Sequence, residues 1–505
     1  MSNTFMNTLV NETNFMTTEN GALVRKTTYN SCLDLFALIG SVRERVDGEI
    51  ITLFEKAYNE DQLTAMKILF YLRDIRGGIG ERNTFRVIAK YMADAHTTSM
   101  RKNLEFIPEF GRWDDLYAFI DTSLQNDALE IIKKQLSKDL ESENPSLLAK
   151  WMPSENTSSS TTRRNATITR KYLKMSPKTY RKTLTKLRKK INIVETKLCE
   201  NNYKDIEYDK LPSGAGLKYK DAFFRHDEER YKQFIEDVSN GKTKINSSTL
   251  FPYELVREAQ LFKYLDYTEK IIPYNGKRTL LNEMWKALPD YIGDNDEDCL
   301  AVVDVSGSMS GTPMQMAISL GLYVAEKNKG AFKNHFITFS ETPELIEIIG
   351  DDLVGKVDFM ESSNWGYNTN LEAVFDLILN VAIKNKLPQS QLPSRLFIIS
   401  DMEFDMAIQD NSWVRHREKI DKETLFQTIA KKYKDAGYEV PTLVFWNATS
   451  RNDLIPAIED DGIKVQYVSG ASPRTFELML KNDTLTALDL MFEAINVERY
   501  NCITV

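Results

Sequence analysis

CLAVVDVSGS, residues 299–308, decides the fold of the C-terminal part of this chain. An apolar run leads into Asp304, and a glycine-containing loop follows before an amphipathic stretch that starts near Pro313. Such a run is typical of a buried strand, and the order strand, loop, helix indicates a parallel sheet with crossover helices. We therefore expect Asp304, Ser306 and Ser308 at the carboxyl edge of a sheet, where open α/β folds bind their ligands.

The sequence around this stretch predicts the rest of the sheet. We expect strands in CLAVVDVS, HFITFS, PELIEII, SRLFIISD, PTLVFWNA and IKVQYVS. Helices are expected between them, in PMQMAISLGLYVAEKNK, NLEAVFDLILNVAIKNK and KETLFQTIAKKYKDAGY. Strand-length runs that alternate with helices predict one α/β domain of Rossmann-like type at residues 291–505.

Asp304-Val305-Ser306-Gly307-Ser308 matches the Asp-x-Ser-x-Ser motif of the metal-ion-dependent adhesion site, so residues 291–505 resemble a von Willebrand factor A domain. The resemblance implies one divalent cation, Mg²⁺ first of all, held also by a threonine from a later loop and an aspartate after the fourth strand. Hydroxyl and carboxylate oxygens are the hard ligands that magnesium prefers. The metal residues expected are Asp304, Ser306, Ser308, Thr369 and Asp401.

Two alternatives stay open at this site. Thr338, on a strand, competes with Thr369 as the threonine ligand, and all five residues can instead serve as helix caps and turn formers. Glu403 and Asp405 are expected on the surface and not as further ligands. If the cation binds, its open position attracts a carboxylate or phosphate oxygen from a partner.

Residues 1–290 follow another pattern, in which apolar residues recur at three and four positions. DQLTAMKILFYLRDI and DALEIIKKQL are examples, and turns such as RGGIGER and PEFGRWDD separate them. Short paired helices with short connections predict a HEAT-like helical-repeat domain at 1–290, in which neighbours bury each other's apolar faces, with a basic insertion at 151–250.

The strongest local charge signal is the stretch from Arg163 to Lys190, which holds twelve Lys or Arg and no acid. Neutralised phosphates supply much of the affinity for RNA, and Tyr172 and Tyr180 are available to stack on bases. The alternative is an amphipathic helix whose lysines only face water, with Leu184, Leu187 and Ile191 on its buried side. The RNA-binding residues expected are Arg163, Arg164, Arg170, Lys171, Lys174, Lys178, Arg181, Lys182, Lys186, Arg188, Lys189 and Lys190.

YLRDIRGGIGERNTFRVIAKYM, IPEFGRWDDLYAFI and KYKDAFFRHDEERYKQFIEDV resemble a family known only as a domain of unknown function, which is related to the TROVE module of the Ro 60-kilodalton autoantigen. In Ro proteins helical repeats form a ring that a von Willebrand factor A domain closes. The ring binds small structured RNAs outside and single-stranded RNA ends in its hole. The resemblance therefore implies a ribonucleoprotein component.

Composition limits the classes of function. Residues 1–290 hold 46 Lys and Arg against 40 Asp and Glu, and residues 291–505 hold 19 against 33, which indicates two modules with different partners. The four cysteines have no paired spacing, and neither a signal peptide nor a membrane-length apolar run is evident. We expect a cytoplasmic protein. Neither a nucleophile paired with a base nor a nucleotide-binding loop stands out in the sequence, so we expect no enzyme.

Together these features predict a non-enzymatic RNA-binding protein of Ro/TROVE type, with RNA quality control or a ribonucleoprotein scaffold as its role and a magnesium-dependent ligand site. The alternative is a protein-interaction or structural component, cellular or viral, whose metal binds an acidic partner without RNA. Copurifying RNA would discriminate between the two.

Overall fold

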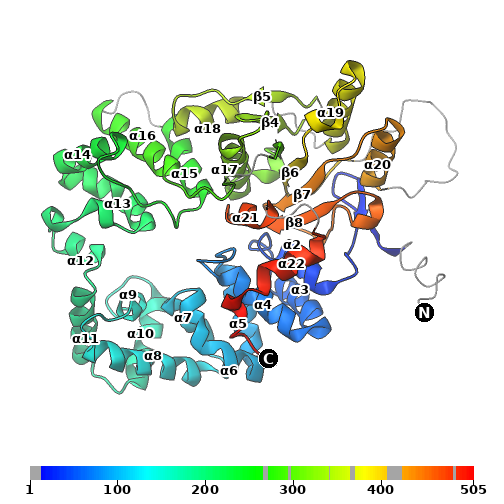
Figure 1. Ribbon diagram of the computed structural model, residues 1–505. Coiled ribbons are helices and arrows are strands. Elements are labelled where there is room, and N and C mark those ends of the chain that lie inside the picture. Colours follow the sequence, from blue (N-terminus) through cyan, green and yellow to red (C-terminus); the bar gives the residue numbers. More distant parts are fainter. Residues whose placement is uncertain are drawn as a thin grey trace. The chain divides into compact units, whose positions relative to one another are not determined.

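The computed structural model (Figure 1) describes residues 13–264, 271–293, 297–340, 342–363, 370–405, 424–480 and 485–505. The chain forms two compact units. The sheet unit consists of Met1–Val46 and Leu250–Ile495, and the helical unit consists of Asp47–Thr249 and Asn496–Val505. Both units are therefore built from segments that are far apart in the sequence.

The core of the sheet unit is a sheet whose described strands follow the order β5-β4-β3-β6-β7-β8. Neighbouring strands are parallel except that β5, at one edge, is antiparallel to β4. Every residue of β3, β6 and β8 is buried, as expected for parallel strands covered on both faces. The strands are β3 (Cys299–Val303), β4 (His335–Thr338), β5 (Leu345–Glu347), β6 (Arg395–Ser400), β7 (Thr442–Asn447) and β8 (Val465–Ser469).

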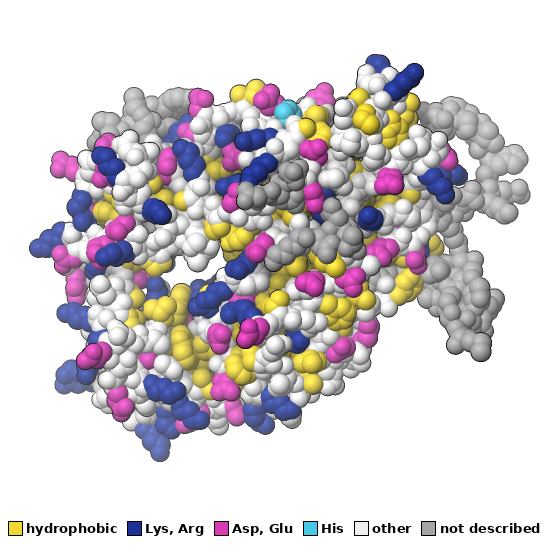
Figure 2. All heavy atoms as spheres, in the orientation of Figure 1, with side chains coloured by type: hydrophobic (Ala, Val, Ile, Leu, Met, Phe, Trp, Pro, Cys, Tyr) yellow, Lys and Arg dark blue, Asp and Glu magenta, His cyan; other side chains and the backbone are white. Residues whose placement is uncertain are grey.

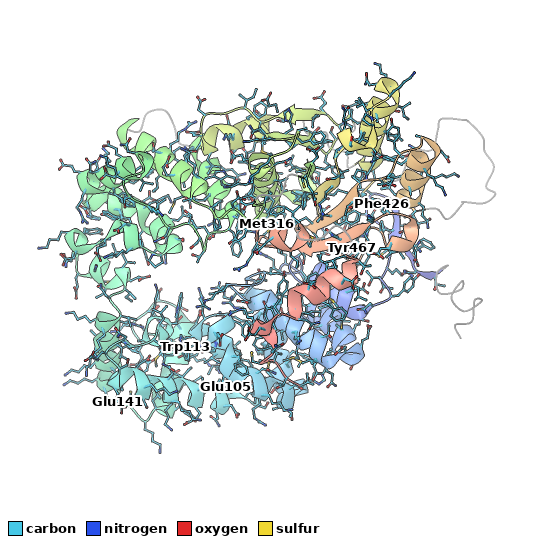
Figure 3. The ribbon with its side chains drawn as sticks, viewed as in Figure 1. Glu105, Trp113, Glu141, Met316, Phe426 and Tyr467 are labelled. Carbon is cyan, nitrogen blue, oxygen red and sulfur yellow. The ribbon has the colours of Figure 1, made fainter. Side chains whose placement is uncertain are left out.

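Helices cover both faces of this sheet. Successive residues of a strand point to opposite faces, so neighbouring strand residues meet different helices. On one face Trp446 packs against Phe476, which also stacks on Tyr323 with ring centroids 5.4 Å apart. On the other face Phe445 meets Phe426 edge-on at 5.1 Å, and Figure 3 labels Phe426 on its helix. The helices around the sheet are α17 (Thr312–Lys327), α19 (Leu371–Asn385), α20 (Leu425–Asp435), α21 (Thr475–Met479) and α22 (Ala487–Ile495).

Three further helices pack on α17 and on one another at the side of the sheet unit. Arg278 binds Asp352, the N-cap residue of α18, whose carboxylate also accepts a hydrogen bond from the Gly355 N–H. This ion pair fixes α16 to the start of α18. The three helices are α15 (Pro252–Gln260), α16 (Ile271–Lys286) and α18 (Leu353–Ser362).

The N-terminal residues belong to the sheet unit, although they precede the first core strand by more than 250 positions. A buried ion pair joins Arg25 to Asp461 at 2.5 Å, and the backbone of Arg25 pairs with Ile455. Gly40 lies so close to β8 that an added Cβ would stand 2.6 Å from the Ser469 carbonyl. The elements here are β1 (Phe15–Thr17), β2 (Leu23–Arg25) and α2 (Ser31–Leu38).

The helical unit is built from consecutive helices joined by short connections. Its core contains Phe70, which meets Phe85 and Phe110 edge-on, and a second aromatic cluster surrounds Tyr231. Its helices are α3 (Asp47–Glu60), α4 (Gln62–Arg73), α5 (Asn83–Ala95), α6 (Thr97–Asn103), α7 (Ile107–Phe110), α8 (Gln125–Glu141), α9 (Leu148–Trp151), α10 (Ser160–Tyr172), α11 (Pro177–Lys190), α12 (Val194–Cys199), α13 (Ser213–His226) and α14 (Glu228–Ser239).

Residues 496–505 complete the helical unit. Arg499 pairs with the fully buried Asp74, and the Tyr500 hydroxyl donates to the same carboxylate at 3.0 Å. The Tyr500 ring stacks on Phe110 at 5.5 Å, and Asn103 exchanges two hydrogen bonds with the backbone of Thr504.

The short 3-10 helices of the described chain are distributed over both units. They are η1 (Leu104–Phe106), η2 (Trp113–Phe119), η3 (Tyr203–Asp205), η4 (Tyr208–Lys210), η5 (Leu261–Tyr264), η6 (Gly307–Met309), η7 (Gln389–Gln391), η8 (Glu459–Asp461) and η9 (Glu498–Tyr500).

Each of the predicted strands and helices of residues 291–505 is present where the sequence predicted it, and α17 begins one residue before its predicted stretch. The sheet with its parallel strands is compatible with a von Willebrand factor A-type domain, and the N-terminal region is rich in helix as expected. The HEAT-like repeat stays a prediction. The domain boundary at 290/291 also stays a prediction, and the two compact units of the structure divide the chain at other positions. No helix in the described part of the chain is long and apolar enough to cross a membrane.

Candidate functional site

The Asp-x-Ser-x-Ser loop leaves β3 at the carboxyl edge of the sheet, as the sequence predicts. Asp304 is 1% exposed, and its carboxylate accepts the Ser306 N–H at 2.8 Å and the Ser400 hydroxyl at 2.6 Å. The hydroxyls of Ser306 and Ser308 lie 2.9 Å apart. Two hydrogen bonds therefore fix the buried carboxylate and leave the serine hydroxyls beside each other at the edge of the sheet.

Asp401 follows β6, the strand next to β3, and its carboxylate belongs to the same cluster. It is 2% exposed. Burial, together with the negative charge of Asp401, raises the pKa of Asp304 to about 6. Two buried carboxylates close together are unfavourable unless a positive charge compensates them.

These residues fit a hard divalent cation. The donor set consists of two hydroxyls and two carboxylates, all oxygen, and the two carboxylates are buried near each other. In the described residues no group of three or more His, Cys, Asp or Glu could hold a metal. That result is consistent with the motif, because serine hydroxyls make up half of its donors.

The threonine ligand is not assigned by the described residues. Thr369 lies outside them. The alternative, Thr338, is buried on β4, where its hydroxyl already accepts the Glu344 N–H at 3.1 Å. The structure therefore brings together Asp304, Ser306, Ser308 and Asp401, which are four of the five predicted metal residues.

Arg451 is the residue at this edge that the sequence reasoning missed. Its guanidinium lies 3.3 Å from the Asp401 carboxylate and donates to the Ser308 carbonyl at 3.1 Å. On its other side it pairs with Glu19 at 2.6 Å. Arg451 stands in the loop after β7, 50 residues beyond Asp401, and belongs to no local motif. Only the adjacency of β6 and β7 could have indicated it.

The expectation that Glu403 lies on the surface is wrong. Glu403 is 2% exposed and accepts hydrogen bonds from the Glu19 N–H at 2.7 Å and from Asn452 at 3.0 Å. Burial raises its pKa, since these two hydrogen bonds compensate only in part for the lost hydration. Glu403 thus ties the N-terminal segment to the loop that carries Arg451. Asp405 forms an isolated bridge with Gly21.

The predicted RNA-binding segment forms two consecutive helices, α10 and α11. Figure 2 shows Lys and Arg side chains gathered over the region of α8, α10 and α11 in the helical unit. Leu184 and Leu187 are buried, which confirms an amphipathic α11, whereas Ile191 is half-buried. Ten of the twelve cations are exposed: Arg163, Arg164, Lys171, Lys174, Lys178, Arg181, Lys182, Lys186, Lys189 and Lys190.

Four residues of this segment make contacts within the protein. Arg170 pairs with Glu155 at 2.7 Å, and Arg188 donates to the Ala149 and Met152 carbonyls, so both hold the fold together. The Tyr180 hydroxyl, buried, donates to the Pro153 carbonyl, and Tyr172 donates to Glu130. Burial withdraws the Tyr180 ring from base stacking, and Tyr172 is half-buried.

Comparison with known proteins gives two matching family models. "Domain of unknown function (DUF2828)" matches residues 18–145 and 145–296, and "Domain of unknown function (DUF7788)" matches residues 298–499. The "Uncharacterized protein L728" of Acanthamoeba polyphaga mimivirus is 32% identical over 524 residues, which cover 95% of this chain and 87% of that protein. The Ro (RSR) protein of Deinococcus radiodurans, a solved structure, gives a TM-score of 0.46 at 12% identity, over 89% of this chain and 99% of that chain.

Proposed function

The chain belongs to the family described as "Domain of unknown function (DUF2828)", and we propose that it is a non-enzymatic RNA-binding protein of Ro/TROVE type with a magnesium-dependent ligand site. RNA phosphates are bound by the exposed cations of α10 and α11, which we call the basic face. The sheet unit serves as a von Willebrand factor A-type domain, and Ser306 and Ser308 hold the cation with Asp304 and Asp401 behind them.

One observation carries the RNA assignment: most cations of the basic face make no ion pair or hydrogen bond with the rest of the protein. Among the described residues, Arg164 and Lys189 pair with Asp121 and Glu200, and Arg163 and Lys190 donate to backbone carbonyls. The side chains of the other six exposed cations make neither an ion pair nor a hydrogen bond within the described part of the chain. Unpaired surface cations repel one another, and a polyanion relieves that repulsion. The six residues are Lys171, Lys174, Lys178, Arg181, Lys182 and Lys186.

Charge reversal on α11 tests this assignment. We expect Arg181→Glu, Lys182→Glu and Lys186→Glu together to weaken RNA binding and to lower the slope of log affinity against log salt by about 2, since each lost contact to single-stranded RNA releases about 0.7 fewer counterions. The measurement is filter binding of a labelled RNA across a salt series. A slope equal to that of the wild type would leave the basic face as a solvated helix surface.

A matched control separates local contact from net charge. Lys90, Lys218 and Lys244 are exposed cations elsewhere in the helical unit, so their reversal to Glu changes the net charge of the protein by the same amount. This control is expected to keep most of the wild-type slope. Equal losses in both triple variants would mean that RNA responds only to the overall charge.

The cation site supplies the second part of the proposal. A magnesium ion bound there provides a Lewis-acidic position for a carboxylate or phosphate oxygen of a partner. Ser306 and Ser308 offer their hydroxyls to it, and Asp304, held by Ser400, compensates its charge. The alternative function, capture of an acidic protein without RNA, predicts purified protein free of nucleic acid in the ratio of absorbance at 260 to 280 nm.

A further inference from the structure

A group of arginines in the helical unit lies apart from the basic face in sequence. The group, called the arginine cluster, consists of Arg73 at the end of α4, Arg82 and Arg86 at the start of α5, and Arg112 before η2. Two carboxylates of η2 face it. Asp115 binds Arg73 at 2.8 Å and Arg86 at 2.6 Å, and Asp114 binds Arg112 at 2.7 Å and Arg86 at 2.9 Å.

These pairs leave the cluster with excess positive charge, because four guanidinium groups share two carboxylates. The Arg82 side chain has no ion-pair or hydrogen-bond partner among the described residues, and its Nε is inaccessible to solvent and unsatisfied. Burial, followed by the charges of Arg112 and Arg86, lowers the pKa of Arg82. The neighbouring acid Glu81 turns its carboxylate to the Asn83 N–H at 2.8 Å and so caps the start of α5.

The surroundings of Arg82 contain a second unsatisfied group. Thr84, two residues further along α5, is 1% exposed, and its hydroxyl has no partner among the described residues. Buried polar groups in folded proteins nearly always have a hydrogen-bond partner. A buried group without a protein partner is commonly satisfied by a ligand, an ion or a water molecule. Arg82 and Thr84 are therefore two unmet donors at the start of one helix.

Aromatic rings accompany the cluster on the side of η2. The Arg112 guanidinium lies over the Trp151 ring, 4.0 Å from its centroid. Trp113, the next residue, is half-buried on η2, and its indole N–H has no hydrogen-bond partner among the described residues. Figure 3 labels Trp113 within the helical unit. Partly exposed indole and guanidinium planes are the surfaces on which nucleobases stack.

We propose that the arginine cluster is a binding site for a nucleoside monophosphate group. Arg82 is the cation that binds the phosphate, Arg86 and Arg112 flank it, and the base packs on the aromatic side of η2. A phosphomonoester fits because it carries between one and two negative charges at neutral pH, and guanidinium groups bind phosphate oxygens in pairs. This site goes beyond the basic face, which contacts the diester backbone of RNA.

Calorimetric titration of the full chain with adenosine monophosphate and with adenosine tests the site. We expect the monophosphate to bind at least tenfold more tightly than adenosine. Arg82→Gln is expected to reduce the affinity for the monophosphate roughly tenfold, the value of one charge-assisted hydrogen bond, and Arg82→Lys is expected to recover part of the loss. Since Arg82 has no internal partner, these variants should fold as the wild type does, which circular dichroism checks.

The matched control is Lys90→Gln, an exposed cation on the same helix, which should leave the affinity unchanged. Equal binding of the monophosphate and adenosine, or an Arg82→Gln variant that binds as the wild type does, would overturn the proposal. Competition by a ten-nucleotide RNA with a 5′-phosphate, compared with the same RNA ending in a 5′-hydroxyl, distinguishes an RNA end from a free nucleotide as the source. Reversal of the basic face is expected to leave monophosphate binding intact, so the two proposals can fail separately.

Discussion

At the scale of single residues, the proposed cation site combines side chains that are close in the sequence with others that are distant from them. Asp304, Ser306 and Ser308 are close in sequence, and Asp401 could be placed because it ends an obvious apolar strand. Arg451 and Glu19 come from distant loops, and only the folded chain brings them to Asp401. A motif records local geometry, whereas the charges that compensate it can come from anywhere in the chain.

Asp304→Asn should abolish magnesium binding and yet stabilise the metal-free protein. The variant removes a buried negative charge beside Asp401, and an amide keeps nearly the same shape. We expect magnesium to raise the melting temperature of the wild type and to leave that of the variant unchanged. Thermal unfolding in magnesium and in EDTA measures both effects. An equal rise in wild type and variant would mean that the cation binds elsewhere.

Arg451→Gln should tighten magnesium binding. The guanidinium stands beside Asp401 and the Ser308 carbonyl, so it compensates the carboxylate charge and repels an incoming cation. Its removal is expected to increase the affinity for magnesium several-fold in a calorimetric titration. Arg474→Gln, a cation of the sheet unit at a different loop, is the control. Weaker magnesium binding in Arg451→Gln would show that the arginine supports the site and does not compete.

At the scale of elements, the five parallel strands were predictable because strands buried on both faces are continuous apolar runs, whereas β5 is a mostly exposed antiparallel edge strand. The two strands before α2 were not predicted, because they are short and owe their place to Asp461 and Ile455, more than 400 residues away. The twelve cations of 163–190 were visible in the sequence, but the contacts that Arg170 and Arg188 make with Glu155 and Ala149 were not.

Gly111→Ala should destabilise the start of η2. A Cβ at this position would stand 2.4 Å from the Asp115 carboxylate and 2.7 Å from Arg73, both buried, so the ion pair must separate. We expect a loss of about 2–3 kcal/mol in the free energy of unfolding, measured with urea. Gly214→Ala is the control, because nothing lies within 4 Å of its Cβ and alanine favours the helix. An unchanged Gly111→Ala would mean that the pair can move freely.

At the scale of the whole molecule, residues 496–505 hold the helical unit together. Arg499→Gln leaves the buried Asp74 carboxylate with fewer partners. We expect the free energy of unfolding of this unit to fall by about 2 kcal/mol, which is less than for a fully buried ion pair because Arg499 is partly exposed. Hydrogen exchange of α4 and α7 is the measurement. Asp74→Asn combined with Arg499→Gln should recover part of the loss, and an additive loss would show that the two residues do not interact.

The same segment sets an order on synthesis. Asp74 is made early, but Arg499 and Tyr500 leave the ribosome some 425 residues later. Until then the helical unit carries an exposed apolar surface at Phe110 and an unpaired carboxylate beneath it. The sheet unit also cannot complete its fold early, because its first segment precedes the helical unit in the chain and its core strands follow the helical unit. Neither unit can finish folding before nearly the whole chain has been translated, so apolar surface of both units stays incompletely covered for most of its synthesis.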